Sequence, residues 1–225
     1  MEKKRRRTRE IQPLKWCICT EGKTEEIYLR SYCRALGIER LVDFNSDNNA
    51  CKSKSDKGCG RQHMPLIDQI QICNRKSKYE KMIAVHDYDG DLNGGNAKTF
   101  DEASVAGEQA GIPVFYSIPC FEYWLLLHRN YMDMDLSSAQ CIEKVKRHIN
   151  DSRAAKGKPA LTKSAYKTDL DLFAYFDGLD GVKTAKRNAQ KRFSYKKPPK
   201  KASSIKPSSN LYLLLDELEK LAERR

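Results

Sequence analysis

Along the first 130 residues, short apolar segments that predict strands alternate with segments whose apolar residues recur at helical spacing. The apolar, partly β-branched segments are short, as buried strands are. Strands are expected at residues 14–20, 82–85 and 112–118. Helices are expected at residues 24–36, at 65–74, over about ten residues ending at Ala110, and at 119–128. This alternation predicts an α/β fold with a mostly parallel sheet flanked by helices.

After residue 130 the pattern becomes helical. Helices are expected near residues 137–150, 162–176 and 181–192, and a last amphipathic helix begins at Asn210. Leucines recur along one side of that last helix, at Leu211, Leu214, Leu215, Leu218 and Leu221. Such a stripe can pack on the core of its own chain or dock on a partner. We therefore divide the chain into a basic arm at 1–13, a catalytic domain at 14–130 and a helical extension at 131–225.

Residues 45–62 are polar and predict a long loop. Cys51, Cys59, His63 and Cys73 could bind zinc, but their spacing matches no paired Cys-x₂-Cys pattern, so we do not expect a zinc site. The other cysteines have apolar neighbours, as reduced core thiols do. They are Cys17, Cys19, Cys33, Cys120 and Cys141.

The charge of the chain favours a polyanionic partner. The formal net charge is +12, and ten Lys or Arg residues without any Asp or Glu lie between Lys183 and Lys206. Basic blocks can be solvated tails, but they also bind phosphates. The basic residues that we expect to contact nucleic acid are Lys23, Lys167, Lys186, Arg187, Lys191 and Arg192.

Nothing in the sequence predicts membrane insertion or export. The chain has no run of about 18 apolar residues, which a transmembrane helix would need. The basic start is not followed by an apolar stretch of signal-peptide length. We expect a cytoplasmic protein without a membrane partner.

Acidic residues follow two of the expected strands. Glu21 and Gly22 follow the first strand, and Asp87, Asp89 and Asp91 follow the second. Open α/β sheets place their ligands at the carboxyl ends of strands. Carboxylates gathered there repel one another unless a cation such as Mg²⁺ or Mn²⁺ neutralises them. Acidic residues at these positions can also be helix caps or solvated turn residues, and Asp91 is the weakest of the candidate metal ligands.

Three segments resemble those of the RloB-like family, which is related to the Toprim domain of topoisomerases, bacterial primases and OLD-type nucleases. They are Cys19-Thr20-Glu21-Gly22-Lys23-Thr24-Glu25-x-x-Tyr28, Asp87-Tyr88-Asp89, and Pro119-Cys120-Phe121-Glu122-Tyr123-Trp124-Leu125-Leu126-Leu127-His128. Pro207-Ser208-Ser209-Asn210-Leu211-Tyr212 is similar to a further family element before the last helix. The resemblance covers residues from about 14 to about 220.

This resemblance implies a Toprim-like fold, a divalent metal ion, and a role in prokaryotic defence against phage beside an AAA-type ATPase. It implies that Glu21 is the general acid/base, that Asp87 and Asp89 hold the metal, and that Glu122 is a further acidic residue of the site. The chain departs from the family pattern at His86, Tyr88 and Ile118. These departures leave the implied metal ligands intact but affect residues expected near the substrate.

We therefore expect a metal-dependent nuclease that acts on DNA or RNA, tRNA included, and that is controlled by an ATPase partner. The chain could also form homo-oligomers. The alternative is a non-catalytic Toprim subunit that senses or scaffolds within a defence complex. His128 is a further but weaker candidate for the site, since its position favours the interpretation as a helix-end histidine.

Overall fold

A computed structural model describes residues 15–45, 79–88, 97–162, 165–193 and 201–224. Several predictions fall outside this part of the chain, so they stay predictions. They concern the basic arm 1–13, most of the loop 45–62, the helix 65–74, the residues Cys51, Cys59, His63 and Cys73, and the acidic residues Asp89 and Asp91.

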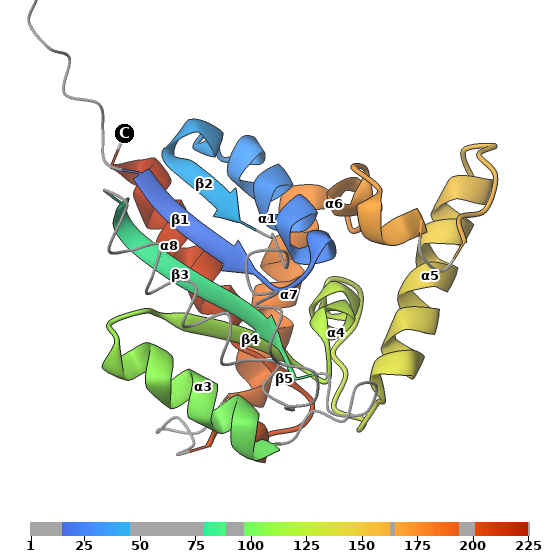
Figure 1. Ribbon diagram of the computed structural model, residues 1–225. Coiled ribbons are helices and arrows are strands. Elements are labelled where there is room, and N and C mark those ends of the chain that lie inside the picture. The colour runs from blue at the N-terminus through green and yellow to red at the C-terminus, as the bar shows by residue number, and fades with distance from the viewer. Residues whose placement is uncertain (1–14, 46–78, 89–96, 163–164, 194–200, 225) are drawn as a thin grey trace, which may run out of the picture.

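The described strands form one five-stranded sheet in the order β2-β1-β3-β4-β5 (Figure 1). The strands are β1 (Lys15–Thr20), β2 (Val42–Asn45), β3 (Tyr79–Asp87), β4 (Val114–Ile118) and β5 (Ser208–Ser209). All neighbours pair in parallel except β4 and β5, which are antiparallel. The expectation of a mostly parallel sheet in an α/β fold is confirmed.

Two strands were not predicted, because neither has an apolar pattern of its own. In β2 only Val42 is fully buried, and its other residues are half-buried at the edge of the sheet. The two serines of β5 have no apolar side chain. The strand is instead held by its hydrogen bonds, including one between the hydroxyl groups of Ser117 and Ser209 at 3.0 Å.

Helices cover both faces of the sheet (Figure 1). Cys17 and Cys19 point to the face where Ala103 of α3 (Ala97–Gln109) packs, whereas Trp16 and Ile18 join the main core on the other face. The main core contains residues of the remaining helices. These are α1 (Lys23–Ala35), α4 (Phe121–Leu127), α5 (Ser138–Ala154), α6 (Leu172–Tyr175), α7 (Gly178–Arg192) and α8 (Leu211–Glu223). The described residues also include three short 3₁₀ turns, namely η1 (Glu39–Leu41), η2 (Ala165–Thr168) and η3 (Ala202–Ser204).

The prediction of one continuous helix over residues 162–176 is wrong. The described part of this segment consists of the turn η2 and the short helix α6, separated by Asp169, Leu170 and Asp171. The Asp169 carboxylate accepts a hydrogen bond from the backbone N–H of Asp171 at 2.9 Å. Aspartate side chains that bind nearby backbone groups compete in this way with helix formation.

One core joins the sheet to the C-terminal helices. It includes residues from Trp16 to Leu221, so it crosses the predicted domain boundary at residue 130. The five leucines of α8 are all buried within it. Their stripe therefore packs on the core of the chain, and the alternative that it docks on a partner is wrong for this face.

Asn210 links the last helix to the sheet. Its side-chain oxygen accepts a hydrogen bond from the Tyr116 amide at 2.6 Å, and its side-chain nitrogen donates to the Val114 carbonyl at 3.3 Å. Its backbone N–H donates to the Tyr116 carbonyl. These three bonds place β5 and the start of α8 beside β4.

The cysteines that lie within the described residues are buried and reduced, as expected. None of the described helices combines the length and the apolar character that a membrane crossing requires.

Candidate active site

Glu21 and Asp87 meet at the carboxyl ends of neighbouring strands. β1 and β3 run parallel, with Thr20 opposite Val85, so both acidic residues reach the same edge of the sheet. The backbone N–H of Asp87 donates a hydrogen bond to Glu21 Oε2 at 3.2 Å. The prediction that the two strand ends bring these residues together is confirmed.

Asp87 also contacts the start of α4. Its Oδ2 accepts a hydrogen bond from the backbone N–H of Phe121 at 2.8 Å. This N–H is one of those at a helix start that have no partner within the helix. The Asp87 carboxylate is therefore fixed between the end of β3 and the first turn of α4.

Glu122 follows in that first turn and is 4% exposed. The Tyr166 hydroxyl donates a hydrogen bond of 2.6 Å to Glu122 Oε1, and the Lys167 ammonium lies 3.9 Å from the same oxygen. Both partners belong to η2, which Thr24 of α1 contacts through a hydrogen bond to the Lys167 carbonyl at 3.5 Å. The turn η2 thus joins α1 to Glu122.

Sequence reasoning missed Glu25 as a site residue, because an acidic residue in the first turn of a helix has a sufficient explanation in the helix dipole. The Glu25 carboxylate lies against Gly22, where an added Cβ would stand 2.5 Å from Oε2. Burial raises the pKa of Glu25 to about 8, and the charges of Glu122 and Glu21 add to this shift while Lys167 opposes it. Glu25 is therefore a fourth carboxyl group near the other three.

These four residues, Glu21, Glu25, Asp87 and Glu122, are called the acidic cluster below. Among the described residues, no group of three or more His, Cys, Asp or Glu side chains is close enough to form a complete metal site. The predicted ligands Asp89 and Asp91 lie beyond the described part. The donor chemistry fits Mg²⁺ or Mn²⁺, since carboxylate oxygens are the ligands that these cations prefer. Metal binding stays a prediction.

His128 belongs to the core beside the acidic cluster. It is 3% exposed, with one ring nitrogen 2.9 Å from the Tyr28 hydroxyl and the other 3.0 Å from the Phe176 carbonyl. Burial lowers the pKa of His128 to about 4. A neutral histidine with these two partners connects α1 and α4 to the segment before α7.

His86 and Tyr88, where the chain departs from the family pattern, both contact Phe100 of α3. The His86 ring stacks on Phe100 at 4.7 Å, and the Tyr88 ring meets it edge-on at 5.3 Å. On its other side Tyr88 carries the Lys206 ammonium, 3.9 Å from the ring centre. These substitutions therefore form part of the packing between β3 and α3.

Of the predicted nucleic-acid contacts, Arg187 and Lys191 are exposed on α7. Lys191 lies over the Tyr131 ring at 5.4 Å. Lys23 pairs with Glu26, and Lys167 stands at the acidic cluster. That these residues contact nucleic acid stays a prediction.

Lys186 and Arg192 have partners within the protein. The Lys186 ammonium forms ion pairs with Asp216 and Glu219, and its side chain is 16% exposed. Arg192 donates hydrogen bonds to the carbonyls of Pro207 and Lys206 at 3.0 and 2.7 Å. Both residues hold the C-terminal segment in place, so a contact with nucleic acid would have to compete with these bonds.

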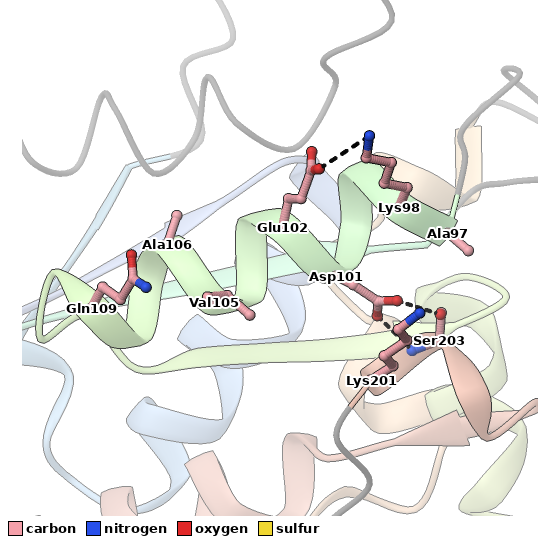
Figure 2. A pocket seen from close by; sticks show the side chains of 9 residues that line it. All are labelled: Ala97, Lys98, Asp101, Glu102, Val105, Ala106, Gln109, Lys201 and Ser203. Atoms are coloured by element: carbon pink, nitrogen blue, oxygen red, sulfur yellow. Dashed lines mark hydrogen bonds and ion pairs between the residues drawn. The ribbon is translucent and has the colours of Figure 1, made fainter.

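A cavity of about 580 Å³ lies along α3, between this helix and the segment of Lys201 and Ser203 (Figure 2). Asp101 accepts hydrogen bonds from the backbone N–H and the hydroxyl of Ser203, at 2.9 and 2.7 Å, which fixes η3 against α3. Val105 and Ala106 give the cavity an apolar wall. No residue of the acidic cluster lines it.

Comparison with known proteins identifies one family. A family model described as "RloB-like protein" matches residues 16–218, most of the chain. Searches of curated proteins and of solved structures gave no match.

Proposed function

Starting from the fact that this chain belongs to the RloB-like family, we propose that it is a divalent-metal-dependent nuclease. The observation that supports this proposal most strongly is the acidic cluster at the carboxyl edge of the parallel strands. The Lys167 ammonium lies beside the cluster, 3.9 Å from Glu122. Carboxylates gathered in this way favour the binding of a metal ion.

Glu21, Asp87 and the predicted ligand Asp89 would hold the metal, with Glu25 and Glu122 close by. When bound, Mg²⁺ or Mn²⁺ would polarise the phosphodiester and neutralise charge on the oxygens. The Phe121 N–H keeps Asp87 oriented, and the Tyr166 hydroxyl does the same for Glu122. A carboxylate oxygen of Glu21 would accept the proton of the attacking water.

Lys167 would contact the phosphate. Its side chain is 47% exposed while its ammonium lies near Glu122, so a phosphate that approaches from solvent can meet it at the edge of the acidic cluster. A lysine there offsets the repulsion between an anionic substrate and the carboxylates. Arg187 and Lys191 would add contacts to the backbone farther along the nucleic acid.

The substrate would be DNA or RNA, with tRNA as one candidate, and the biological role would be defence against phage in the cytoplasm. Since an unrestrained nuclease would damage its host, we propose that an AAA-type ATPase partner controls the activity. The isolated chain is then expected to be weakly active. Robust cleavage by the purified chain without any trigger would contradict this control.

The proposal is tested with purified protein, DNA, total RNA and tRNA in the presence of Mg²⁺, Mn²⁺ or EDTA. We expect metal-dependent cleavage of at least one substrate, which Glu21→Gln abolishes while the circular dichroism spectrum stays unchanged. Binding of nucleic acid without cleavage, with and without the ATPase, would favour the alternative of a non-catalytic subunit. Cleavage that persists in Glu21→Gln would place the active site elsewhere.

A further inference from the structure

A second, polar cavity is lined by residues that lie next to Asp87 and to the Glu122 segment in the sequence. It has a volume of about 380 Å³, which lies within the range of about 300–1,000 Å³ that is common for small-molecule sites. Tyr88, which directly follows Asp87, forms one wall, and Ile118 and Pro119, which precede the segment of Glu122, form another. A group bound there would therefore lie next to a phosphate at the carboxylates.

The far wall is the start of α5. Asp135, Leu136, Ser137 and Gln140 line it. The Ser137 hydroxyl accepts a hydrogen bond from the Gln140 N–H at 3.2 Å, and Gln140 Oε1 accepts one from the Ser137 N–H at 2.8 Å. This capping box uses the oxygen of the Gln140 amide, and the NH₂ group of the same side chain is a double donor that takes no part in the box. The wall thus combines a carboxylate acceptor with an amide donor.

Lys206 adds a cation at the cavity. Its ammonium lies 3.9 Å from the centre of the Tyr88 ring, and the other side of that ring meets Phe100. The cation–π contact keeps the ammonium at the cavity wall. A cation there is suited to a phosphate oxygen of the bound chain.

We propose that this cavity binds one guanine nucleotide of the nucleic-acid substrate, next to the phosphate that is cleaved. An ionised aspartate only accepts hydrogen bonds, so it requires N–H donors on the base. Guanine presents two adjacent donors, N1–H and the 2-amino group, to a carboxylate, and its O6 and N7 accept from an amide or ammonium group. Adenine has an acceptor at N1 instead and would oppose Asp135. The inference rests on the proposed function and adds a base preference to it.

The cavity also sets the form of the substrate. A base can enter such a pocket only when its Watson–Crick edge is unpaired, as in a single strand or a loop. We therefore expect the preferred guanine to be unpaired. The two recognition elements have separable effects, because Asp135 reads the base while Lys206 holds the phosphate.

The test measures binding by full-length protein that carries Glu21→Gln, so that substrate is not consumed. The probes are short single-stranded oligoadenylates, as DNA and as RNA, in which one adenine is kept or replaced by guanine or by inosine. We expect the guanine probe to bind about tenfold more tightly than the all-adenine probe, the value of one good bidentate contact. Inosine, which lacks the 2-amino group, should fall between them.

Adding Asp135→Asn should remove this preference, whereas the matched control Asp133→Asn, on an exposed neighbour outside the cavity, should keep it. Lys206→Met should weaken the binding of all three probes by a similar factor.

Equal binding of guanine and adenine probes, or a preference that survives Asp135→Asn, would overturn the inference and leave the nuclease proposal standing. If none of the probes binds, the inference fails, and the cleavage assay with Glu21→Gln decides the nuclease proposal separately. Cleavage fragments whose ends are not enriched in guanine would likewise overturn the inference alone.

Discussion

The two ends of α1 lie at groups of acidic residues that differ in their charge balance. At its start, the acidic cluster has four carboxyl groups, with the Lys167 ammonium 3.9 Å from Glu122. At its other end, Tyr32 donates a hydrogen bond to Glu219 at 2.7 Å, and the Lys186 ammonium forms ion pairs with Glu219 and Asp216. The second group, called the Lys186 network below, is neutralised to within one charge by the protein itself.

The pKa shifts of the two groups express the same difference. Burial raises the pKa of Glu25 to about 8, with further repulsion from Glu122 and Glu21. Burial alone would also raise the pKa of Glu219, but hydrogen bonds from Lys186 and Tyr32 lower it below its ordinary value. The protein thus supplies a cation that stabilises the ionised form of Glu219, whereas the raised pKa of Glu25 keeps that carboxyl group protonated at neutral pH. The Lys186 network is therefore structural, and the acidic cluster is the functional candidate.

The largest expected difference is in catalysis. Asp87→Asn should lower the cleavage rate by at least about a hundredfold, since even the loss of an outer-shell partner of a metal ligand costs up to that much. Asp216→Asn, the same change in the Lys186 network, should leave the rate within about threefold of wild type when normalised to folded protein. The measurement is initial rate with Mg²⁺ or Mn²⁺ on the best substrate. Equal losses in both variants would remove the functional distinction.

The second prediction concerns pH. The pKa of Glu25 is about 8 in the folded protein against an ordinary value of 4.5. Between these two pH values the folded protein therefore keeps a proton on Glu25 that the unfolded protein has lost. Its contribution makes the free energy of unfolding fall as pH rises through that window, by at most about 1.4 kcal/mol per pH unit. Glu25→Gln should flatten this fall. Denaturant titrations at pH 5, 6, 7 and 8 without divalent metal measure it.

Glu219→Gln is the control for that experiment. The pKa of Glu219 is lowered, so its stabilising contribution is present at pH 5–8 and is lost only as the pH falls further. This variant should be less stable than wild type but keep the wild-type slope between pH 5 and 8. If Glu25→Gln retains that slope as well, Glu25 is ionised in the folded protein over this pH range and the upward shift of its pKa is wrong.

The third prediction compares Lys186 with Lys167 by replacing each with methionine. Lys186→Met should lower the free energy of unfolding by about 1–2 kcal/mol, because it removes charge-assisted bonds to two partly exposed carboxylates. Lys167→Met should change stability by less than about 0.5 kcal/mol and act instead on substrate affinity. Urea unfolding and nucleic-acid titrations of both variants provide the comparison. A large loss of stability in Lys167→Met would show that Lys167, like Lys186, has a structural role.

The smallest effect is expected from the exposed basic residues of α7. Replacing Arg187 and Lys191 by Gln should weaken binding to all sequences alike and flatten the slope of log affinity against log salt by about one unit per contact. Lys98→Gln on α3 is the matched control and should leave the slope unchanged. A slope that stays at the wild-type value in the double variant would make the α7 charges a solubility feature.

Sequence reasoning predicted most of the fold because β1, β3, β4 and α8 carry strong apolar patterns. It failed where other forces act. Hydroxyl and amide hydrogen bonds, rather than apolar side chains, hold β5, and Asp169 breaks the expected helix through a local bond. Periodicity does not detect either effect.

For the site, strand-end positions were enough to pair Glu21 with Asp87, because parallel strands end at one edge. The environment of Glu25 was not predictable from the sequence. Its carboxylate lies against Gly22, but its burial also depends on the turn η2, which is far along the chain and binds Glu122. Likewise, the spacing of the basic residues of α7 did not indicate that Lys186 forms ion pairs with α8 while its neighbours are exposed. Pairings between distant segments are what a single sequence conceals.

The antiparallel strand β5 has a consequence for how the protein is made. Ser209 binds Ser117, which lies 92 residues earlier in the chain, and Asn210 binds both the backbone N–H and the backbone carbonyl of Tyr116. During translation, β4 therefore stays an open sheet edge while every residue of the acidic cluster has already left the ribosome. Closure of this edge must wait for the segment that precedes α8. A nascent chain that stops short of this segment would carry all four carboxyl groups of the acidic cluster but lack the strand that completes the sheet.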